Sequence, residues 1–328
     1  MALLSVEGLK MYYTTMEGQV KAVDGIDFQL EQGEVLGIVG ESGCGKSSLA
    51  STLLMLLPKN AKVIEGKVLV EGENVVEMSD NKVRKDIRWT KIALVPQGAM
   101  NGLNPIFKVG DQISEAITTH TSVPARETRQ RVSELLHLVA VDPSWGRRYQ
   151  HEFSGGMKQR AMIAMSLALN PKILIADEPT TALDVIVQAG IIRLLLSIRS
   201  EFKTSIILIT HDLALVAQMS EKTAIMYAGK FVEYGSTKEV YKQAAHPYTL
   251  GLLEAFADIR KPKENLTAVP GSPPDLITPP TGCRFHPRCP YAKSICSEVD
   301  PVPEKVSETH VVACHLWKEI REMRRTRA

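Results

Sequence analysis

A glycine-rich octapeptide constrains the fold of this chain more than any other feature. Residues 40–47 read Gly-Glu-Ser-Gly-Cys-Gly-Lys-Ser and match the pattern G-x-x-x-x-G-K-[ST] in full. The octapeptide follows an apolar run, residues 35–39, and precedes a helical stretch, residues 47–57. A loop of this kind turns backbone N–H groups inward around phosphate oxygens, and the helix N-terminus adds partial positive charge. The sequence therefore predicts a phosphate-binding loop between a strand and a helix.

Individual residues of this loop have separate expected roles. Lys46 is expected to reach the β- and γ-phosphates of a nucleotide, and the Ser47 hydroxyl is expected to bind Mg²⁺. Cys44 is either an ordinary loop residue or a reactive thiol, because a helix N-terminus lowers the pKa of a thiol. The remaining phosphate contacts are expected from Gly40, Ser42, Gly43, Cys44, Gly45 and Ser48.

Short apolar runs alternate with helical patterns before residue 260. Alternation of this kind predicts an α/β fold with a mostly parallel sheet, and continuous β-branched runs predict strands buried on both faces. The candidate strands are residues 35–39, 67–70, 92–95, 173–176 and 206–209. The candidate helices lie near residues 46–57, 125–140, 154–169 and 186–201.

A second motif places carboxylates at the end of a predicted strand. Residues 173–179 read Ile-Leu-Ile-Ala-Asp-Glu-Pro, so the apolar run ends in Asp177 and Glu178. Ligands bind at the carboxyl ends of parallel strands. We expect Asp177 to bind Mg²⁺ through oxygen and Glu178 to polarise an attacking water. Taken alone, the pattern is equally typical of a strand that ends in a solvated acidic turn.

Composition and charge narrow the class of protein. Of 328 residues 44% are hydrophobic, and 39 basic side chains stand against 37 acidic ones. This composition excludes a disordered chain, and its balance of charge disfavours bulk binding to nucleic acid. No window approaches about 18 uninterrupted apolar residues, and the N-terminus lacks the basic and apolar regions of a signal peptide. We therefore expect a cytosolic chain without a membrane span.

A third motif resembles the signature of one family of nucleotide hydrolases. Residues 153–160 read Phe-Ser-Gly-Gly-Met-Lys-Gln-Arg and resemble the signature of ATP-binding-cassette (ABC) ATPases, usually Leu-Ser-Gly-Gly-Gln. Ser154 and the amides of Gly155 and Gly156 cap a helix start, which makes a second phosphate-binding end. In the resembled family this end binds the γ-phosphate of the nucleotide held by the opposite subunit. Met157 stands where the family usually has Gln.

Further residues occur in the order of the family's functional positions. Gln97, after Leu-Val-Pro, matches the glutamine loop that senses Mg²⁺ and water and contacts the membrane subunits. Asp184, in Thr-Ala-Leu-Asp, matches the loop that joins the two ATPase subunits. His211 matches the switch histidine, which hydrogen-bonds the γ-phosphate. Tyr13 matches the aromatic residue that stacks on adenine, and Tyr12 is the register alternative.

The resemblance implies an α/β P-loop NTPase fold of the ABC type, with a RecA-like core, an antiparallel β subdomain and an α-helical subdomain. It implies that ATP hydrolysis uses Glu178, His211 and Gln97, and that Mg²⁺ is held by Ser47, Gln97 and Asp177. Two ATPase subunits would sandwich two ATP molecules head to tail. Their closure would drive membrane subunits between inward-open and outward-open states, and phosphoryl transfer would rest mostly on positioning and charge stabilisation.

Within this family the chain is most similar to the ATP-binding subunits of oligopeptide and dipeptide importers, up to about residue 314. That similarity implies uptake of di- and oligopeptides energised from the cytoplasmic face of the membrane. The implied partners are a related second ATPase subunit in a heterodimer, two transmembrane permease subunits and an extracytoplasmic peptide-binding protein. The alternatives are a nickel or oligosaccharide importer and a soluble ABC ATPase that acts on nucleic acid, which balanced charge disfavours. The motifs that carry the similarity are residues 97–105, 184–188, 226–229, 246–249 and 282–285.

Proline and cysteine are concentrated toward the C-terminal end. Ten of 18 prolines lie within residues 262–303, and four of five cysteines lie within residues 283–314. Proline-rich segments with few apolar residues behave as extended connectors. This change predicts an ATPase domain over residues 1–260, followed by a connector and a small Cys-rich module over residues 261–328.

The clustered cysteines predict a metal site. Cys283, Cys289, Cys296 and Cys314 are separated by 5, 6 and 17 residues. Because disulfides are rare in the cytosol, four clustered thiols favour tetrahedral Zn²⁺ or a [4Fe–4S] cluster. The spacing lacks the C-x₂-C pair of zinc fingers, and the resembled importers carry an iron–sulfur cluster in this tail. A structural [4Fe–4S] cluster is therefore favoured over Zn²⁺, with free thiols or disulfides ranked last. A mixed Cys/His site that uses His286 or His315 is a minor variant.

The last residues, 316–328, are basic. They either lie against anionic lipid head groups or form a solvated helix end, and the second interpretation is favoured for so short a charge run. The cations are Lys318, Arg321, Arg324, Arg325 and Arg327.

Overall fold

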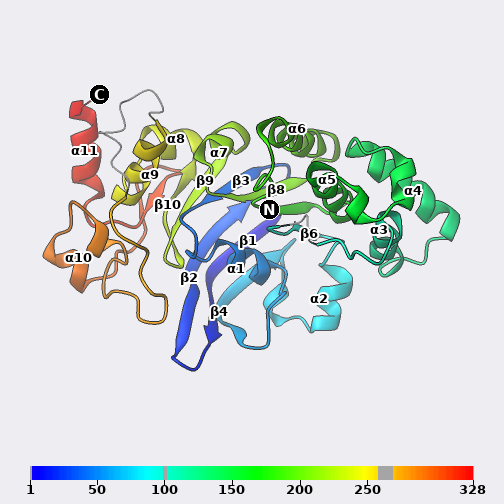
Figure 1. The fold of residues 1–328 in the computed structure, drawn as a ribbon. Helices are drawn as coiled ribbons and strands as arrows, with labels where there is room; N and C mark the ends of the chain where they lie inside the picture. The colour runs from blue at the N-terminus through cyan, green and yellow to red at the C-terminus, as the bar shows by residue number, and fades with distance from the viewer. Residues whose placement is uncertain (1, 99–101, 258–268, 328) are drawn as a thin grey trace. The chain divides into compact units, whose positions relative to one another are not determined.

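The computed structural model describes residues 2–98, 102–257 and 269–327, which divide into two compact units. The first, here the helical unit, comprises Leu30–Glu34 and Val70–Leu208 with the chain start up to Leu3. The second, here the loop unit, comprises Leu4–Gln29, Val35–Leu69 and the chain from Ile209 onward, and it contains the phosphate loop. Figure 1 labels most of the helices and strands of both units.

The helical unit combines a few strands with a group of helices. Its neighbouring strands are in the order β8-β7-β6, and β6 pairs with β7 in parallel, with Ile92 opposite Ile173. The strands are β5 (Glu73–Asn74), β6 (Ile92–Val95), β7 (Ile173–Asp177) and β8 (Ser205–Thr210). The helices are α2 (Asp80–Asp86), α3 (Val109–Thr118), α4 (Ala125–Leu138), α5 (Gly155–Ser166) and α6 (Val185–Phe202).

The sequence of the helical unit explains where two of its helices, α5 and α6, begin. The Ser154 hydroxyl accepts the Met157 N–H at the start of α5, and the Asp184 carboxylate accepts the Val187 N–H at the start of α6. Each cap satisfies an N–H group that has no partner within the helix. Both predicted helices are thereby confirmed, and their N-termini coincide with the signature motif and the Thr-Ala-Leu-Asp motif.

The loop unit contains two sheets. In one sheet the strands are in the order β2-β1-β4, and in the other the order is β11-β12-β10-β9-β3, with β3 and β9 parallel and β9 and β10 antiparallel. These strands are β1 (Leu4–Thr14), β2 (Gln19–Leu30), β3 (Val35–Val39), β4 (Ala61–Val70), β9 (Lys222–Tyr227), β10 (Lys230–Ser236), β11 (Glu304–Lys305) and β12 (Val311–Val312). Its helices are α1 (Lys46–Leu53), α7 (Leu213–Met219), α8 (Thr237–Lys242), α9 (Pro247–Ala257), α10 (Ser294–Glu298) and α11 (Trp317–Arg327).

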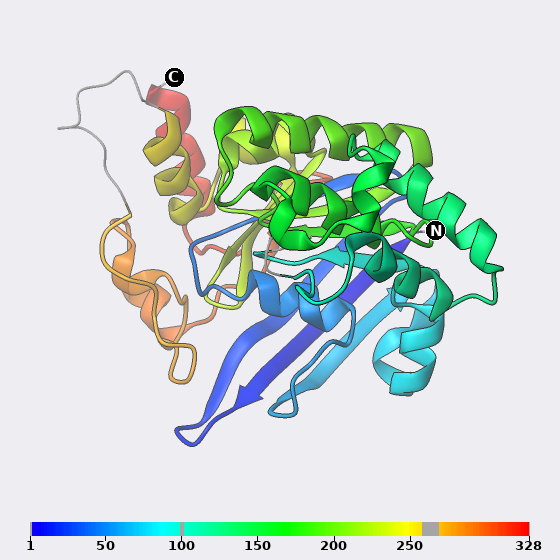
Figure 2. The ribbon, with the colours of Figure 1, turned by 45° about the vertical axis from the view of Figure 1, so that its right-hand side comes forward.

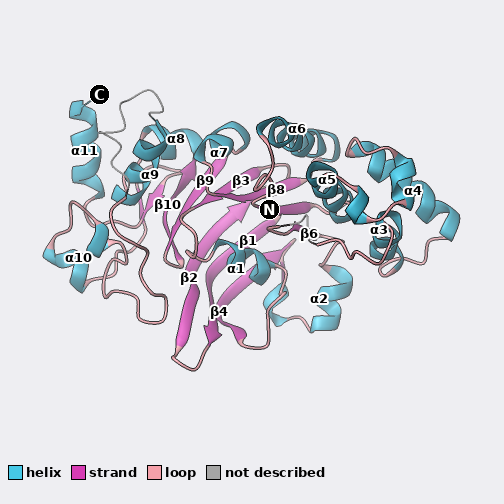
Figure 3. Cartoon of the chain, viewed as in Figure 1, coloured by secondary structure: helices cyan, strands magenta, loops and turns pink. Residues whose placement is uncertain are grey.

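The C-terminal chain packs onto the loop unit as part of its structure. Strand β12 pairs with β10 in antiparallel fashion, with Val312 opposite Glu233. Residues 269–293 are mostly loop (Figure 3), whereas α11 lies beside α9 (Figure 2), where Ile320 and Leu250 share one apolar cluster. Two of the predicted basic residues bind protein groups here: Arg321 donates to Gln243, and Arg324 donates to the Ala244 carbonyl.

The predicted strands are confirmed in position, but the burial expected for one of them is wrong. All five residues of β3 and of β7 are buried, as expected for strands covered on both faces. The prediction is wrong for residues 67–70, because Val68 and Val70 are buried while Lys67 is exposed and Leu69 is half-buried. A run that looks continuous in sequence there alternates between two faces, as in a strand with one covered side.

Two further expectations concern chain boundaries. The helix after the phosphate loop ends at Leu53 instead of residue 57, because Pro58 follows closely and Met55 has a positive φ of 50°. The domain boundary expected after residue 260 lies outside the described residues and stays a prediction. Within the described ranges, no helix is long and apolar enough to cross a membrane.

A carboxylate ties the C-terminal chain to α8. Glu239 accepts hydrogen bonds from the hydroxyls of Ser236, Ser307 and Thr309 at 2.5, 2.6 and 2.6 Å. Burial by itself would raise the pKa of Glu239, but these hydrogen bonds and nearby His310 lower it to about 2. Because its pKa lies below the ordinary 4.5, the ionised carboxylate stabilises the fold above pH 4.5 and loses this effect as the pH falls toward 2.

We predict that Glu239→Gln lowers the free energy of unfolding by about 1–2 kcal/mol at pH 6, and by clearly less at pH 3. Urea unfolding followed by circular dichroism at the two pH values measures the difference. Glu319→Gln is the matched control, since Glu319 forms an exposed ion pair with Lys293. A penalty at pH 3 equal to that at pH 6 would contradict the assigned role of the ionised form.

Candidate nucleotide site

The predicted phosphate loop runs from the end of β3 into α1. Lys46, the first residue of α1, is buried, and its Nζ donates to the carbonyls of Gly40 and Glu41 at 2.7 and 2.9 Å. The ammonium group therefore lies against the loop, where two of its backbone carbonyls bind it. Ser47, which was expected to bind Mg²⁺, is exposed at the N-terminal end of the same helix.

Two glycines of the loop allow backbone to meet backbone. A Cβ at Gly40 would lie 2.1 Å from the Met226 carbonyl oxygen, and one at Gly45 would lie 2.0 Å from the Ala22 carbonyl oxygen. Gly45 also has a φ of 107°, which L side chains rarely adopt. The loop thus follows its path only because neither position carries a side chain.

The two N-terminal tyrosines make different contacts. The Tyr13 hydroxyl donates to the Ser48 hydroxyl at 3.1 Å, in the first turn of α1. The Tyr12 hydroxyl donates to Asp24 at 2.6 Å instead. The geometry therefore brings Tyr13 next to the helix that follows the phosphate loop, which favours the register chosen from the sequence.

The predicted acidic pair lies at the end of β7 in the helical unit. Asp177 is buried, and Glu178 follows it in a left-handed conformation with a φ of 48°. The Glu178 carboxylate accepts hydrogen bonds from Gln97 Nε2 at 3.2 Å and from the Thr181 hydroxyl at 2.9 Å. The structure thus brings Gln97 and Glu178 together, two residues that were singled out separately in the sequence.

The signature motif and the Thr-Ala-Leu-Asp motif also lie near each other. Ser154 is exposed at the start of α5, and Gly156 lies so close to Val187 in α6 that a Cβ would meet its Cγ1 at 2.6 Å. The Met157 backbone N–H donates to the Ser154 hydroxyl, which caps the helix, at 3.3 Å. Because this bond uses the backbone, a Met in place of the usual Gln leaves the cap intact.

His211 belongs to the loop unit, directly after β8. Its side chain is exposed, and the next residue, Asp212, accepts the Leu215 N–H at 3.1 Å to start α7. The candidate residues are therefore divided between the units. Tyr13, residues 40–48 and His211 belong to the loop unit, whereas Gln97, Ser154, Gly155, Gly156, Asp177, Glu178 and Asp184 belong to the helical unit.

The four C-terminal cysteines are neighbours in the fold. Cys283, Cys296 and Cys314 share one apolar cluster, and the Cys283 N–H donates to the Cys296 carbonyl at 2.8 Å. Burial and, to a smaller extent, the nearby thiols of Cys283, Cys289 and Cys296 together raise the pKa of Cys314 to about 12. The Leu316 N–H donates to the Cys314 sulfur at 3.4 Å. In the described part of the chain, no three His, Cys, Asp or Glu side chains are arranged to hold a metal ion.

The contacts between the Cys-rich segment and the phosphate loop were missed by the sequence reasoning. Arg288, one residue before Cys289, forms an ion pair with Glu41 of the loop, and Arg284 pairs with Asp24. Both arginines lie between the first two clustered cysteines and are four residues apart in the sequence. Two arginines so close together weakly indicate a functional role, but nothing in the sequence identifies their acidic partners.

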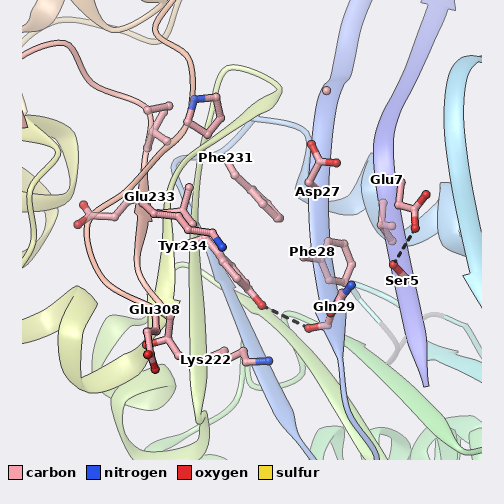
Figure 4. A pocket seen from close by; sticks show the side chains of 18 residues that line it. Ser5, Glu7, Asp27, Phe28, Gln29, Lys222, Phe231, Glu233, Tyr234 and Glu308 are labelled. Atoms are coloured by element: carbon pink, nitrogen blue, oxygen red, sulfur yellow. Dashed lines mark hydrogen bonds between the residues drawn. The ribbon is translucent and has the colours of Figure 1, made fainter. Parts of the chain in front are cut away.

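A separate cavity of about 560 Å³ lies elsewhere in the loop unit, between β2 and the C-terminal chain. Phe28 and Phe231 lie within it with ring centroids 6.0 Å apart, and the Tyr234 hydroxyl donates to the Gln29 carbonyl across it (Figure 4). No residue of the phosphate loop lines this cavity, so it is not part of the candidate nucleotide site.

The close approach at Gly45 leads to a direct prediction. Gly45→Ala should lower the free energy of unfolding by about 3 kcal/mol or more, because a rigid carbonyl lies where the methyl would be. Gly43→Ala is the matched control, since Gly43 also has a positive φ, 81°, but a Cβ there would have no neighbour within 4 Å. Its cost should be about 1–2 kcal/mol, from the backbone conformation alone. Equal losses in thermal or urea unfolding would contradict the steric role of the Ala22 carbonyl.

Comparison with known proteins agrees with these features. Residues 23–181 match the family described as ABC transporter, and residues 232–296 match the oligopeptide/dipeptide transporter C-terminal region. The chain is 45% identical over 318 residues to the dipeptide transport ATP-binding protein DppD of Bacillus subtilis, covering 96% of this chain and 94% of that protein. It is 40% identical to DppD of Caldanaerobacter subterraneus, covering 98% of this chain and 99% of the relative.

A solved structure supports the same assignment. The ATP-binding cassette MJ0796, in a dimeric post-hydrolysis state bound to ADP and Pi, superposes with a TM-score of 0.64 at 26% identity. The superposition covers 71% of this chain and 98% of the cassette. With nearly full-length relatives at 40% identity or more and a cassette fold, the chain belongs to the ABC transporter family of ATPases, in the branch that carries the oligopeptide/dipeptide transporter C-terminal region.

Proposed function

We propose that this chain is the ATP-hydrolysing subunit that energises import of di- and oligopeptides by a membrane ABC transporter. The observation that carries the proposal is similarity over almost the whole chain to proteins named as dipeptide transport ATP-binding proteins. The match of residues 232–296 to the peptide-transporter C-terminal region supports peptides over nickel or oligosaccharide as the cargo. The alternative of a soluble ABC ATPase that acts on nucleic acid has no such support.

Within this function, the loop unit would hold the nucleotide. Lys46 would exchange its hydrogen bonds to the loop carbonyls for the β- and γ-phosphates, and the N–H groups of residues 40–48 would surround them. Tyr13 would stack on adenine, and His211 would hydrogen-bond the γ-phosphate. Mg²⁺ would neutralise phosphate charge when bound, and Ser47, Gln97 and Asp177 offer the oxygen ligands that it prefers.

Glu178 would polarise the attacking water. Its carboxylate is oriented by hydrogen bonds from Gln97 and Thr181, which leave it positioned rather than free to rotate. Ser154, Gly155 and Gly156 would bind the γ-phosphate of the nucleotide held by a second ATPase subunit, and Asp184 would lie at the junction of the two subunits. The implied assembly is peripheral on the cytoplasmic face, with a heterodimeric ATPase pair, two permease subunits and an extracytoplasmic peptide-binding protein.

We predict that Glu178→Gln lowers ATP turnover by about a hundredfold or more while ATP binding persists, because only the group that polarises water is lost. Phosphate release and nucleotide retention measure the two steps. Glu134→Gln, which alters an exposed glutamate on α4, is the matched control and should retain turnover. Near-normal turnover by Glu178→Gln would remove this residue from the proposed role.

We also propose that the C-terminal segment is a small module in which Cys283, Cys289, Cys296 and Cys314 hold a [4Fe–4S] cluster, with Zn²⁺ as the alternative. The donor set fits such a group: the four thiols are neighbours in the fold, and a backbone N–H donates to the Cys314 sulfur. Since no preformed ligand group occurs among the described residues, binding would draw the sulfurs together. The group would serve as a structural staple for a segment with little core.

The cluster proposal predicts brown protein with broad absorbance at about 400 nm after anaerobic purification. Iron and acid-labile sulfide analysis should give about four of each per chain, as expected for this cluster. Cys296→Ser should abolish the absorbance, whereas Cys44→Ser, which alters the only cysteine outside the segment, should retain it. Colourless protein with one bound zinc would establish the alternative instead.

A further inference from the structure

The Cys-rich segment reaches the phosphate loop through one side chain. Both Arg288 guanidinium Nη atoms donate to the Glu41 carboxylate, at 2.6 and 3.0 Å. The Arg288 side chain is 6% exposed and that of Glu41 is 26% exposed, so this fork-to-fork pair is largely shielded from water. Bidentate pairs of this kind fix geometry as well as charge, and shielding strengthens them relative to surface ion pairs.

Every other donor of Arg288 is also used. Its Nε donates to the Pro270 carbonyl at 2.6 Å, and its Nη atoms further contact the Gly271 carbonyl and the Tyr227 hydroxyl. The guanidinium carbon lies 5.7 Å from the centre of the Tyr227 ring. The arginine is therefore held rigidly by the C-terminal chain and by β9, and it presents a fixed surface to Glu41.

The loop is held at neighbouring points by further residues of the loop unit. The Glu41 N–H donates to the Tyr248 hydroxyl at 3.0 Å, and the rings of Tyr248 and Phe285 are 5.3 Å apart. At the other side of the loop, the Gly229 N–H donates to the Cys44 carbonyl at 2.8 Å. Arg284 in turn donates to the carbonyl of Ala228, next to Gly229. The two arginines thus support both sides of the phosphate loop, Arg288 directly and Arg284 through residues 228–229 of the β9–β10 turn.

The charges of Glu41 and Arg288 affect phosphate binding as well as packing. Glu41 places a carboxylate within a loop that binds polyanionic phosphates, and an unpaired carboxylate there would repel them. Arg288 neutralises that carboxylate and holds it in place. We propose that Arg288 is a positioning residue for the nucleotide site. It acts through Glu41, because it holds the phosphate loop in its shape and prevents the Glu41 carboxylate from repelling ATP. The inference rests on the proposed binding of ATP by this loop.

Nucleotide affinity of the full chain tests this role. Arg288→Met should raise the Kd and the KM for ATP by about tenfold, because it leaves the Glu41 carboxylate unpaired beside the phosphates. Turnover at saturating ATP should fall much less, since the catalytic residues are unaltered. Arg288→Lys, which keeps the charge but loses the fork, should give an intermediate affinity.

The double variant Glu41→Gln/Arg288→Met separates pairing from simple structural damage. It removes both charges, so it should fold and recover an affinity within about threefold of the unaltered chain. Lys293→Met is the matched control, because it removes a cation of the same segment that forms an exposed ion pair with Glu319. Equal Kd values for Arg288→Met and Lys293→Met, or no recovery in the double variant, would overturn the role. Absence of ATP binding by the unaltered chain would instead count against the proposed function.

Discussion

The phosphate loop depends on two places where its backbone touches the carbonyl oxygens of other strands. Gly40 lies against Met226 of β9, and Gly45 lies against Ala22 of β2. Neither contact tolerates a Cβ, so the shape of the loop is set by strands that are far away in sequence. The enclosed Lys46 ammonium follows from this shape, because the carbonyls it binds are those that the curve turns inward.

The C-terminal chain reinforces the same region from outside. Glu233 of β10 is fully buried and accepts the N–H groups of Ala245 and His246 together with His310 Nε2 at 2.8 Å. One carboxylate thereby joins β10, the start of α9 and the chain before β12. An unpaired buried carboxylate would be costly, so these segments stay together as a set. The Arg288–Glu41 pair extends that linkage to the loop itself.

This arrangement suggests why an ATPase cassette would carry a Cys-rich segment in contact with its nucleotide loop. A group bound by the cysteines would stiffen the backbone on both sides of Arg284 and Arg288. Stiffer arginines would hold Glu41 and the β9–β10 turn more firmly, with the loop between them. The proposed structural role of the cluster and the proposed positioning role of Arg288 would therefore both serve to hold the phosphate loop in place.

Local patterns predicted much of the fold and of the candidate site. Strands with both faces covered, such as residues 35–39 and 173–176, can be recognised from the sequence because they are uninterrupted apolar runs. Strand β4 was misjudged at residues 67–70, since a run of mixed residues does not reveal that only one face is covered. The helix after the loop was predicted too long because its apolar pattern continues to the residue before Pro58.

The sequence by itself determined the phosphate loop, the acidic strand end, the signature motif and the clustering of cysteines. In each case adjacent residues carry the chemistry, so spacing along the chain is enough. Only the tertiary structure decided that Tyr13 rather than Tyr12 meets α1, that Gln97 orients Glu178, and that Arg288 reaches Glu41. The last pair is separated by 247 positions, and no local preference specifies a partner at that distance. Such pairs form because buried charges require partners and packing brings them within reach.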